Sequence, residues 1–350
     1  MKKRWIIVAI LLPCVCWPQM QTQTKDLAKN VRIGVLGLFH PRQIVLSAMP
    51  GNPLECMSTD ERLPVQDHLE LQLAQTSIKI TAGARTLSVV SIACGDSQGG
   101  PAEFTVTVPG KISRRYFGKM EIKPQPRELI IVIEMDLEIA VASVVAAESP
   151  PHAPLEALKA QAVATRSFLR AGKGRHRNFD FCDTTHCQFL REPPAPQAAA
   201  FQATTATRGL VLAYKDEVFA AMYSSSCGGR THSLEELGLP VRGYPYFGVV
   251  CDYCHRHPQK WVAEISEADA ATLTGTESSR LKLARKLGWK VLPSNSYSSH
   301  REGGDVVLEG VGVGHGIGLC QRGAADMARH GATFQQILEH YYPNAEVKQY

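Results

Sequence analysis

The chain has 350 residues, of which 44% are hydrophobic and 20% are charged, and its formal net charge is +5. This composition predicts a globular protein with one large hydrophobic core or two modest ones. The positive charge is mild and forms no run of like charges, which argues against a nucleic-acid partner. Ten cysteines are too few for a disulfide-knit miniprotein of this length but suffice for one or two bridges or metal sites.

The N-terminal segment, MKKRWIIVAILLPCVCW, has a basic head followed by an apolar run. This pattern is typical of a secretory signal, and the run is short for a bilayer span, which needs roughly 20 apolar residues. We therefore predict a signal peptide at residues 1–20, with a retained signal anchor as the alternative because no clean cleavage site follows. The protein is expected to be exported: periplasmic, cell-wall associated, or anchored facing outward, with membrane contact only through an uncleaved anchor.

Short β-branched runs dominate the first third of the chain and predict a β-rich region over residues 27–125, which continues as similar runs up to about residue 134. The runs are VRIGVLGLF, QIVLSA, LELQL, SIKITA, TLSVVSIA, FTVTV and LIIVIEM. Glycine and proline turn signals separate them, such as Pro50-Gly51-Asn52-Pro53 and Pro109-Gly110.

From Asp136 the pattern changes, and LEALKAQAVATRSFLRA places apolar side chains at steps of three and four residues. This spacing predicts one long amphipathic helix, with Pro154 at its start and Gly172 at its end. Further helices are expected over 321–330 and 334–341, and a shorter one in SSRLKLARKLG, while RGLVLAY and EVFAAMYSSS resemble strands. The predicted fold class is α+β, with the β-rich portion joined to a mixed α/β portion at 126–350.

Glu148 ends an apolar run, VVAAE, and precedes Ser149-Pro150-Pro151 and the long helix. A carboxyl group at the end of a buried segment loses solvation, which favours its protonated form and suits it to donate a proton. The alternative is an ordinary acid near the positive end of the following helix. The local sequence by itself favours that alternative.

A compact group of possible metal ligands follows the long helix and comprises His176, Cys182, His186 and Cys187. Two imidazoles and two thiolates form a ligand set for tetrahedral zinc, although the spacing differs from that of a zinc finger. A Cys182–Cys187 disulfide and free structural residues are the alternatives. The two histidines favour a metal, and four protein ligands leave no open position, so the metal would hold a loop rather than activate water.

The glycine-rich stretch EGVGVGHGIGLCQRG surrounds His315 just before the helix predicted at Gln321. It has neither a Gly-Lys-Ser/Thr ending nor the framing of a dinucleotide-binding fold. His315 is therefore either a buried, hydrogen-bonded histidine or a site residue.

Three further cysteines, Cys227, Cys251 and Cys254, lie near His255 and His257. Their spacing permits a disulfide with a spare thiol or a second Cys/His metal site. The expectation of export favours the disulfide.

Four ordered motifs resemble the SpoIID/LytB family, which groups stage II sporulation protein D with amidase-enhancer relatives. The motifs are VVAAESPPHAPLEALKAQAVATRSF, FCDTTHCQ, YSSSCGGRT and GVGHGIGLCQRGAADMARHGATFQQILEHYYP. The resemblance covers about residues 110 to 345. It implies a lytic transglycosylase that acts on peptidoglycan glycan strands.

The resemblance also implies roles for individual residues. Glu148 stands in the place of the glutamate of the family's Gly-Glu-Met-Pro signature and would be the catalytic acid, although its neighbours here are Ala147 and Ser149. The group His176, Cys182, His186 and Cys187 would hold a structural zinc ion. Positions implied to bind substrate are Gln161, Arg166, Tyr223, Ser225, His315 and Gln321.

The implied reaction is cleavage between N-acetylmuramic acid and N-acetylglucosamine, with Glu148 acting first as acid and then as base to give a 1,6-anhydro end. The resemblance also supports an alternative from another class, a non-catalytic wall-binding enhancer of an N-acetylmuramoyl-L-alanine amidase. In that case the partners would be the glycan and a cell-wall amidase. A zinc hydrolase with His315 as ligand is disfavoured because no His-Glu-x-x-His helix occurs.

Overall fold

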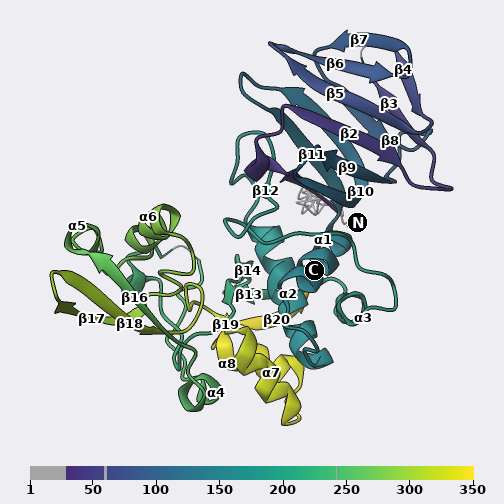
Figure 1. The fold of residues 1–350 in the computed structure, drawn as a ribbon. Coiled ribbons are helices and arrows are strands. Elements are labelled where there is room, and N and C mark those ends of the chain that lie inside the picture. The colour runs from purple at the N-terminus through teal and green to yellow at the C-terminus, as the bar shows by residue number, and fades with distance from the viewer. Residues whose placement is uncertain (1–28, 59–60, 242) are drawn as a thin grey trace, which may run out of the picture.

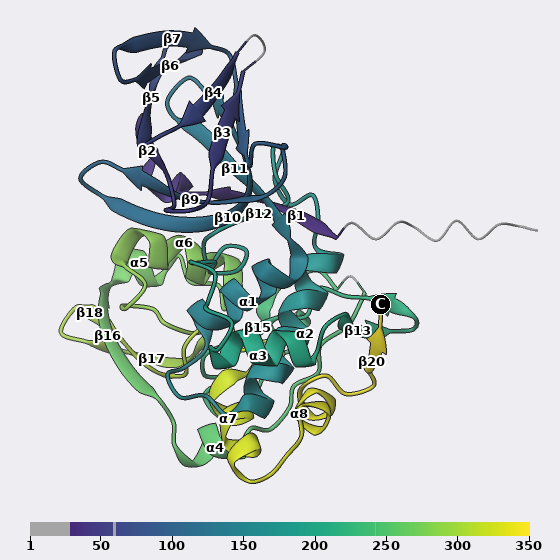
Figure 2. The ribbon, with the colours of Figure 1, turned by 90° about the vertical axis from the view of Figure 1, so that its right-hand side faces the viewer.

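The computed structural model describes residues 29–58, 61–241 and 243–350, and Figures 1 and 2 show it from two sides. A large β-sheet lies at one end and most helices lie at the other, which confirms the predicted α+β class. The predicted signal segment at 1–20 lies outside the described residues. No helix in these ranges is long and apolar enough to cross a bilayer.

Twelve strands form the large sheet. They are β1 (Asn30–Val35), β2 (Gln43–Ala48), β3 (Leu54–Met57), β4 (Arg62–Val65), β5 (His68–Ala74), β6 (Ser77–Ala82), β7 (Arg85–Val89), β8 (Ile92–Gly95), β9 (Ala102–Val108), β10 (Ile112–Pro124), β11 (Leu129–Asp136) and β12 (Phe181–Cys182). The main path runs β12-β1-β11-β10-β9-β2-β5-β6-β7, and β8, β3 and β4 branch from β10. A short 3-10 helix, Gly37–Phe39, follows β1.

The longest strand, β10, was not expected from the sequence because charged residues interrupt its apolar run. Its side chains nevertheless alternate, and Tyr116, Met120 and Ile122 are buried on one face. Its first half pairs with β9 and its second half with β11 and β8. Gly118 marks the change of partner: its φ is +155°, and a Cβ there would lie 2.5 Å from the carbonyl oxygen of Glu134.

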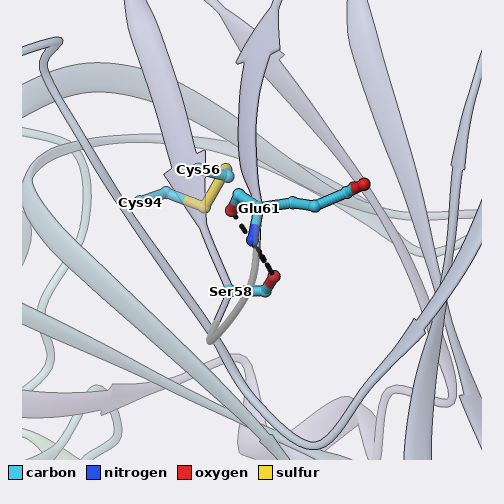
Figure 3. Close-up of a disulfide and its surroundings, with 4 residues drawn as sticks. All are labelled: Cys56, Ser58, Glu61 and Cys94. Carbon is cyan, nitrogen blue, oxygen red and sulfur yellow. Dashed lines mark hydrogen bonds between the residues drawn. A yellow bond between two sulfur atoms is a disulfide. The ribbon is translucent and has the colours of Figure 1, made fainter.

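A disulfide joins Cys56 on β3 to Cys94 on β8, where the two residues face each other across antiparallel strands (Figure 3). Beside it, Ser58 follows β3 and Glu61 precedes β4, and the Glu61 amide donates to Ser58 Oγ at 3.2 Å. The sequence does not indicate this pairing, because 38 positions separate the two cysteines.

Three helices follow the sheet: α1 (Leu137–Glu148), α2 (Leu155–Ala171) and α3 (Ala199–Ala206). The predicted long helix matches α2, with Pro154 as its N-cap and Gly172 as its C-cap. In contrast, the sequence of α1 shows only an apolar run, which does not predict a helix. Asp136 caps α1 by accepting the amides of Glu138 and Ile139. Helix α2 packs against α1, α3, α7 (Gln321–Arg329) and α8 (Phe334–Tyr341), so it lies at the centre of the helical part.

The remaining elements form three small sheets and their helices. They are β13 (Leu210–Tyr214), β14 (Glu217–Val218), β20 (Glu346–Gln349), β15 (Tyr223–Ser224), β19 (Leu319–Cys320), β16 (Lys260–Ser266), β17 (Ser296–Glu302), β18 (Asp305–Val311), α4 (Asp252–Arg256), α5 (Glu267–Ala270), α6 (Glu277–Leu287) and the 3-10 helix Glu235–Leu237. The strand expected over EVFAAMYSSS is reduced to the two short strands β14 and β15. Strands β16–β18 and helices α5 and α6 surround a small core of their own.

The large sheet contains strands from both sides of the boundary predicted at residues 125 and 126, because β11 and β12 follow it in sequence. Strand β1 pairs with β11 on one side and with β12 on the other. The core of the sheet also includes buried residues of α1, such as Val141 and Val145. The segment that leads to Glu148 therefore grows directly out of the sheet.

Candidate functional site

Glu148 is the last residue of α1, at the point where the chain turns toward α2. Pro150 disfavours a helical conformation at Ser149, which is extended and caps the helix through its amide to Val145 O. The turn brings this end of α1 next to α2, where Ser149 donates to Gln161. The side chain is partly buried rather than exposed in bulk solvent.

Burial raises the pKa of Glu148 above 4.5, because a desolvated carboxyl group favours its neutral form. Three groups oppose this shift. The Tyr223 hydroxyl and the Phe189 backbone N–H interact with the carboxylate, and Arg191 contributes a positive charge nearby. The pKa nevertheless stays raised, so Glu148 holds its proton at a higher pH than an ordinary glutamate.

Tyr223, which interacts with Glu148, and the two side chains beside it have unused hydrogen-bonding capacity. The Tyr223 hydroxyl lies among Glu148, Thr165 and Gln161, and burial raises its pKa well above 10. Gln161 Oε1 accepts from Ser149 Oγ at 2.9 Å. Among the described residues, Tyr223 OH, Thr165 Oγ1 and Gln161 Nε2 are buried without a hydrogen bond of regular geometry. Such buried groups usually bind water or a ligand.

Two other predicted residues support this group from the glycine-rich segment. Gln321 begins α7, and its Nε2 donates to the backbone oxygen of Glu148 at 2.9 Å, which satisfies a carbonyl at the open end of α1. His315 Nδ1 accepts the Ile317 amide at 3.0 Å, and its ring also interacts with the backbone of Tyr223. Burial lowers the pKa of His315 to about 4, so the ring is neutral at neutral pH.

Ser225 and Arg166 lie differently. Ser225 is partly exposed, two residues after Tyr223, and its carbonyl accepts the Arg322 amide at 3.2 Å. Arg166 is fully buried and makes a bidentate ion pair with Glu138 at 2.7 and 2.8 Å, and it also donates to Leu210 O. All these contacts are internal, so the structure does not bring Arg166 to Glu148, and we assign it to packing of the helices rather than to substrate.

The four predicted metal ligands converge on one point in the loop after α2. Their ligand atoms all lie within 4.8 Å of one another. His176 Nε2 lies 3.3 Å from Cys187 Sγ, and His186 Nδ1 lies 3.7 Å from Cys182 Sγ. This donor set and spacing fit a tetrahedral ion. The disulfide alternative does not form, since Cys182 and Cys187 are both free.

This cluster, which we call the loop cluster, is connected to Glu148 and to the sheet. Cys187 lies two residues before Phe189, whose amide donates to Glu148. Asp183, between two of the ligands, is buried and accepts the Leu36 amide at 3.1 Å and Arg114 at 2.8 Å. The loop is thus fixed to the sheet on one side and reaches Glu148 on the other.

The disulfide expected among Cys227, Cys251 and Cys254 is not present, because all three cysteines are free and buried. Cys320 joins them in a second group of four sulfurs. His255 and His257 are exposed and do not belong to this group.

Sequence reasoning missed several groups at the site. A backbone amide such as that of Phe189 carries no side-chain signal. Thr165 had a signal, because it lies four positions after Gln161 on the same helix and so on the same face.

Comparison with known proteins gives consistent matches. The family model described as SpoIID, stage II sporulation protein, matches residues 125–214. An uncharacterized protein of Brachyspira hyodysenteriae is 29% identical over 67% of this chain and 73% of its own length. Stage II sporulation protein D of Bacillus amyloliquefaciens is 26% identical over 62% and 76%. The amidase enhancer of Bacillus subtilis is 24% identical over 58% of this chain but only 39% of its own length.

Proposed function

The chain belongs to the SpoIID/LytB family, and from this membership and the geometry of Glu148 we propose that it is a peptidoglycan lytic transglycosylase. The observation that carries the proposal is a partly buried carboxyl group with a raised pKa, surrounded by buried polar groups with unused hydrogen-bonding capacity. A raised pKa keeps the carboxyl group protonated closer to neutral pH, as a general acid requires.

The proposed reaction uses one proton twice. Glu148 donates its proton to the oxygen between N-acetylmuramic acid and N-acetylglucosamine, the glycosidic bond breaks, and an oxocarbenium-like muramyl centre forms. The Glu148 carboxylate then removes the proton from the 6-hydroxyl of the same sugar. That oxygen bonds to the anomeric carbon and gives a 1,6-anhydro end, so no water is consumed.

The surroundings of Glu148 support a mechanism with one carboxyl group. The groups that act on the pKa of Glu148 are the Tyr223 hydroxyl, the Phe189 amide and Arg191, and none of these is a carboxylate. Ordinary glycosidases need two, one as acid and one as base or nucleophile. The Phe189 N–H is suited to stabilise the carboxylate after it has lost its proton, because hydrogen bonds to charged groups are the stronger ones.

Substrate contacts are assigned by position. The proposed glycan-binding residues are Gln161, Tyr223 and Ser225. Gln161 and Tyr223 carry buried polar atoms without a partner near Glu148, and Ser225 is partly exposed two residues after Tyr223. Gln321 and His315, which were expected to bind substrate, are proposed to position Glu148 and Tyr223 through backbone contacts.

The loop cluster is proposed to hold a structural zinc ion through His176, Cys182, His186 and Cys187. With four protein ligands the ion would fix the fold of the loop and would supply no chemistry to the reaction. Its effect on catalysis would be indirect, through the position of the Phe189 amide.

The proposed place of action is the cell envelope, outside the cytoplasm. The basic and apolar N-terminal segment supports export. The Cys56–Cys94 disulfide gives independent support, because such bonds persist mainly in oxidising compartments.

The experiment is product analysis on purified glycan strands without stem peptides, using mass spectrometry. The wild-type protein should release fragments with 1,6-anhydro ends, and Glu148→Gln should reduce turnover by about 10² to 10⁴, the usual contribution of a general acid. The matched control is Glu192→Gln, an exposed carboxylate near the same loop, which should cleave at the wild-type rate. Cleavage by Glu148→Gln at the wild-type rate would refute the assignment.

The second candidate function is that of a non-catalytic amidase enhancer. It is favoured by the similarity to the Bacillus subtilis amidase enhancer and by the changed neighbours of Glu148, Ala147 and Ser149. The same product analysis separates the two functions. An enhancer would stimulate a cell-wall amidase without producing new sugar ends, and Glu148→Gln would stimulate it as well as the wild type.

A further inference from the structure

A second group of four sulfurs lies in the helical part of the molecule, apart from the loop cluster. Its members come from three separate segments: Cys227 follows β15, Cys251 and Cys254 lie at α4, and Cys320 ends β19. All four are buried, with exposed fractions of 2%, 1%, 0% and 0%. We call this group the buried cluster.

We propose that the buried cluster is a second, all-cysteine site for a single tetrahedral zinc ion. The four sulfurs lie within 4.8 Å of one another, and Cys254 Sγ lies 3.5 Å from Cys320 Sγ. Four thiolates about 2.3 Å from one zinc ion lie about 3.8 Å apart. The observed spacing therefore suits one shared ion, and Cys251-x-x-Cys254 has the ligand spacing of structural zinc sites.

Polar groups are directed at three of the sulfurs. The Cys227 amide donates to Cys320 Sγ at 3.4 Å, the Tyr341 hydroxyl lies 3.3 Å from Cys251 Sγ, and the Ser226 hydroxyl lies 3.5 Å from Cys254 Sγ. Hydrogen bonds of this kind orient metal ligands and stabilise the negative charge of thiolates. In an otherwise apolar core they are the expected surroundings of a charged site.

The packing around the sulfurs leaves room for thiolates but not for larger side chains. Gly323 on α7 lies against the cluster, and a Cβ there would come within 2.5 Å of Cys251 Sγ. A cavity of about 410 Å³ reaches the cluster at Cys251, and its lining also includes Gly323 and Tyr341.

Two disulfides are the chemical alternative, since four close thiols in an oxidising compartment would otherwise react. Among the described residues, a disulfide forms between Cys56 and Cys94, and the four cysteines of the buried cluster are free. Two bridges would also pair the sulfurs two by two, whereas here all four are mutual neighbours. A shared ion accounts for this arrangement.

The site would connect the segments that carry Tyr223 and Gln321. Cys227 follows Tyr223 by four residues, and Cys320 directly precedes Gln321, which donates to the Glu148 carbonyl. Strands β15 and β19 are parallel neighbours at this point. An ion here would therefore fix Tyr223 and Gln321 relative to each other.

The first test is X-ray absorption at the zinc edge on the full-length wild-type protein, together with elemental analysis. A Cys₂His₂ site and a Cys₄ site together predict about two zinc ions per chain, with on average about three sulfur ligands and one nitrogen ligand each. Because it needs no substitution, this test does not depend on how a variant folds. An average of two sulfurs and two nitrogens would overturn the proposal, as would iron in place of zinc.

The second test assigns the ion to its ligands. Cys254→Ser should lose about one zinc ion relative to its parent, and His186→Ala should lose the other, whereas the Cys56→Ser/Cys94→Ser double variant should keep the wild-type content. Peptide mapping after alkylation in denaturant and chelator, without reductant, should find Cys227, Cys251, Cys254 and Cys320 alkylated. Disulfide-linked peptides among these four would overturn the proposal.

Discussion

The loop cluster and the buried cluster have the same number of possible ligands but differ in origin and surroundings. The loop cluster comes from one segment of twelve residues, 176–187, and His186 is exposed. The buried cluster joins segments almost a hundred residues apart inside a hydrophobic core. Each lies next to a contact of Glu148: Cys187 near the Phe189 amide, and Cys320 next to Gln321.

The two clusters lie next to different contacts of the same carboxyl group. An ion in the loop cluster would hold the loop whose Phe189 amide donates to the Glu148 side chain, so loss of a ligand there should mainly affect catalysis. The buried cluster lies in the core beneath α7 and α8, so its loss should mainly affect folding stability.

The largest expected effect comes from replacing one ligand in each cluster. Cys320→Ser should lower the free energy of unfolding by on the order of 3 kcal/mol or more. It removes a proposed metal ligand and buries a hydroxyl group without a hydrogen-bond partner. Cys187→Ser should lower turnover by about 10- to 100-fold with a smaller loss of stability. Urea denaturation and glycan turnover, measured on both variants, check the contrast. Equal stability losses would contradict it.

A smaller effect is expected from Tyr223→Phe, which removes the hydroxyl beside Glu148. Turnover should fall by about tenfold, which corresponds to roughly 1.4 kcal/mol in the activation barrier. The Tyr223 hydroxyl lowers the pKa of Glu148, so its removal should raise that pKa further. The high-pH limb of the rate profile should therefore move to higher pH. A shift to lower pH would contradict the proposed contact.

The smallest effect concerns the stability of Glu148→Gln. The pKa of Glu148 is raised in the folded state, so its contribution to stability is present at low pH and is lost as pH rises through the raised pKa. Glutamine avoids this loss. The variant should melt at a slightly higher temperature than wild type at pH 7, and the difference should shrink below pH 4.5. A lower melting temperature at pH 7 would indicate that the carboxylate stabilises the fold.

Much of the fold followed from local patterns. Helix α2 and the C-terminal helices α7 and α8 lie where their apolar spacing predicts, because amphipathic periodicity is a local signal. Helix α1 and strand β10 were missed for opposite reasons. The first is apolar on nearly all sides and shows little periodicity, and the second alternates charged with apolar residues.

The site was predictable to the extent that its side chains are close in sequence. The loop cluster could be predicted because two histidines and two cysteines lie within twelve positions, and Glu148 from the resemblance to a family signature. The ion pair of Arg166 could not be predicted, because a polar residue on an amphipathic helix gives no sign that a partly buried Glu138 will neutralise it. Likewise, no local pattern connects Cys320 with the other three cysteines, because the pairing of β19 with β15 brings them together.

Local sequence patterns predict the α+β class, the long helix after Glu148 and the four side chains of the loop cluster as candidate ligands. The environment of Glu148, the Cys56–Cys94 pairing and the convergence of Cys227, Cys251, Cys254 and Cys320 arise only in the folded chain. The physical reason is that desolvation and sulfur–sulfur contact depend on which distant segments pack together, and local sequence does not encode these distances.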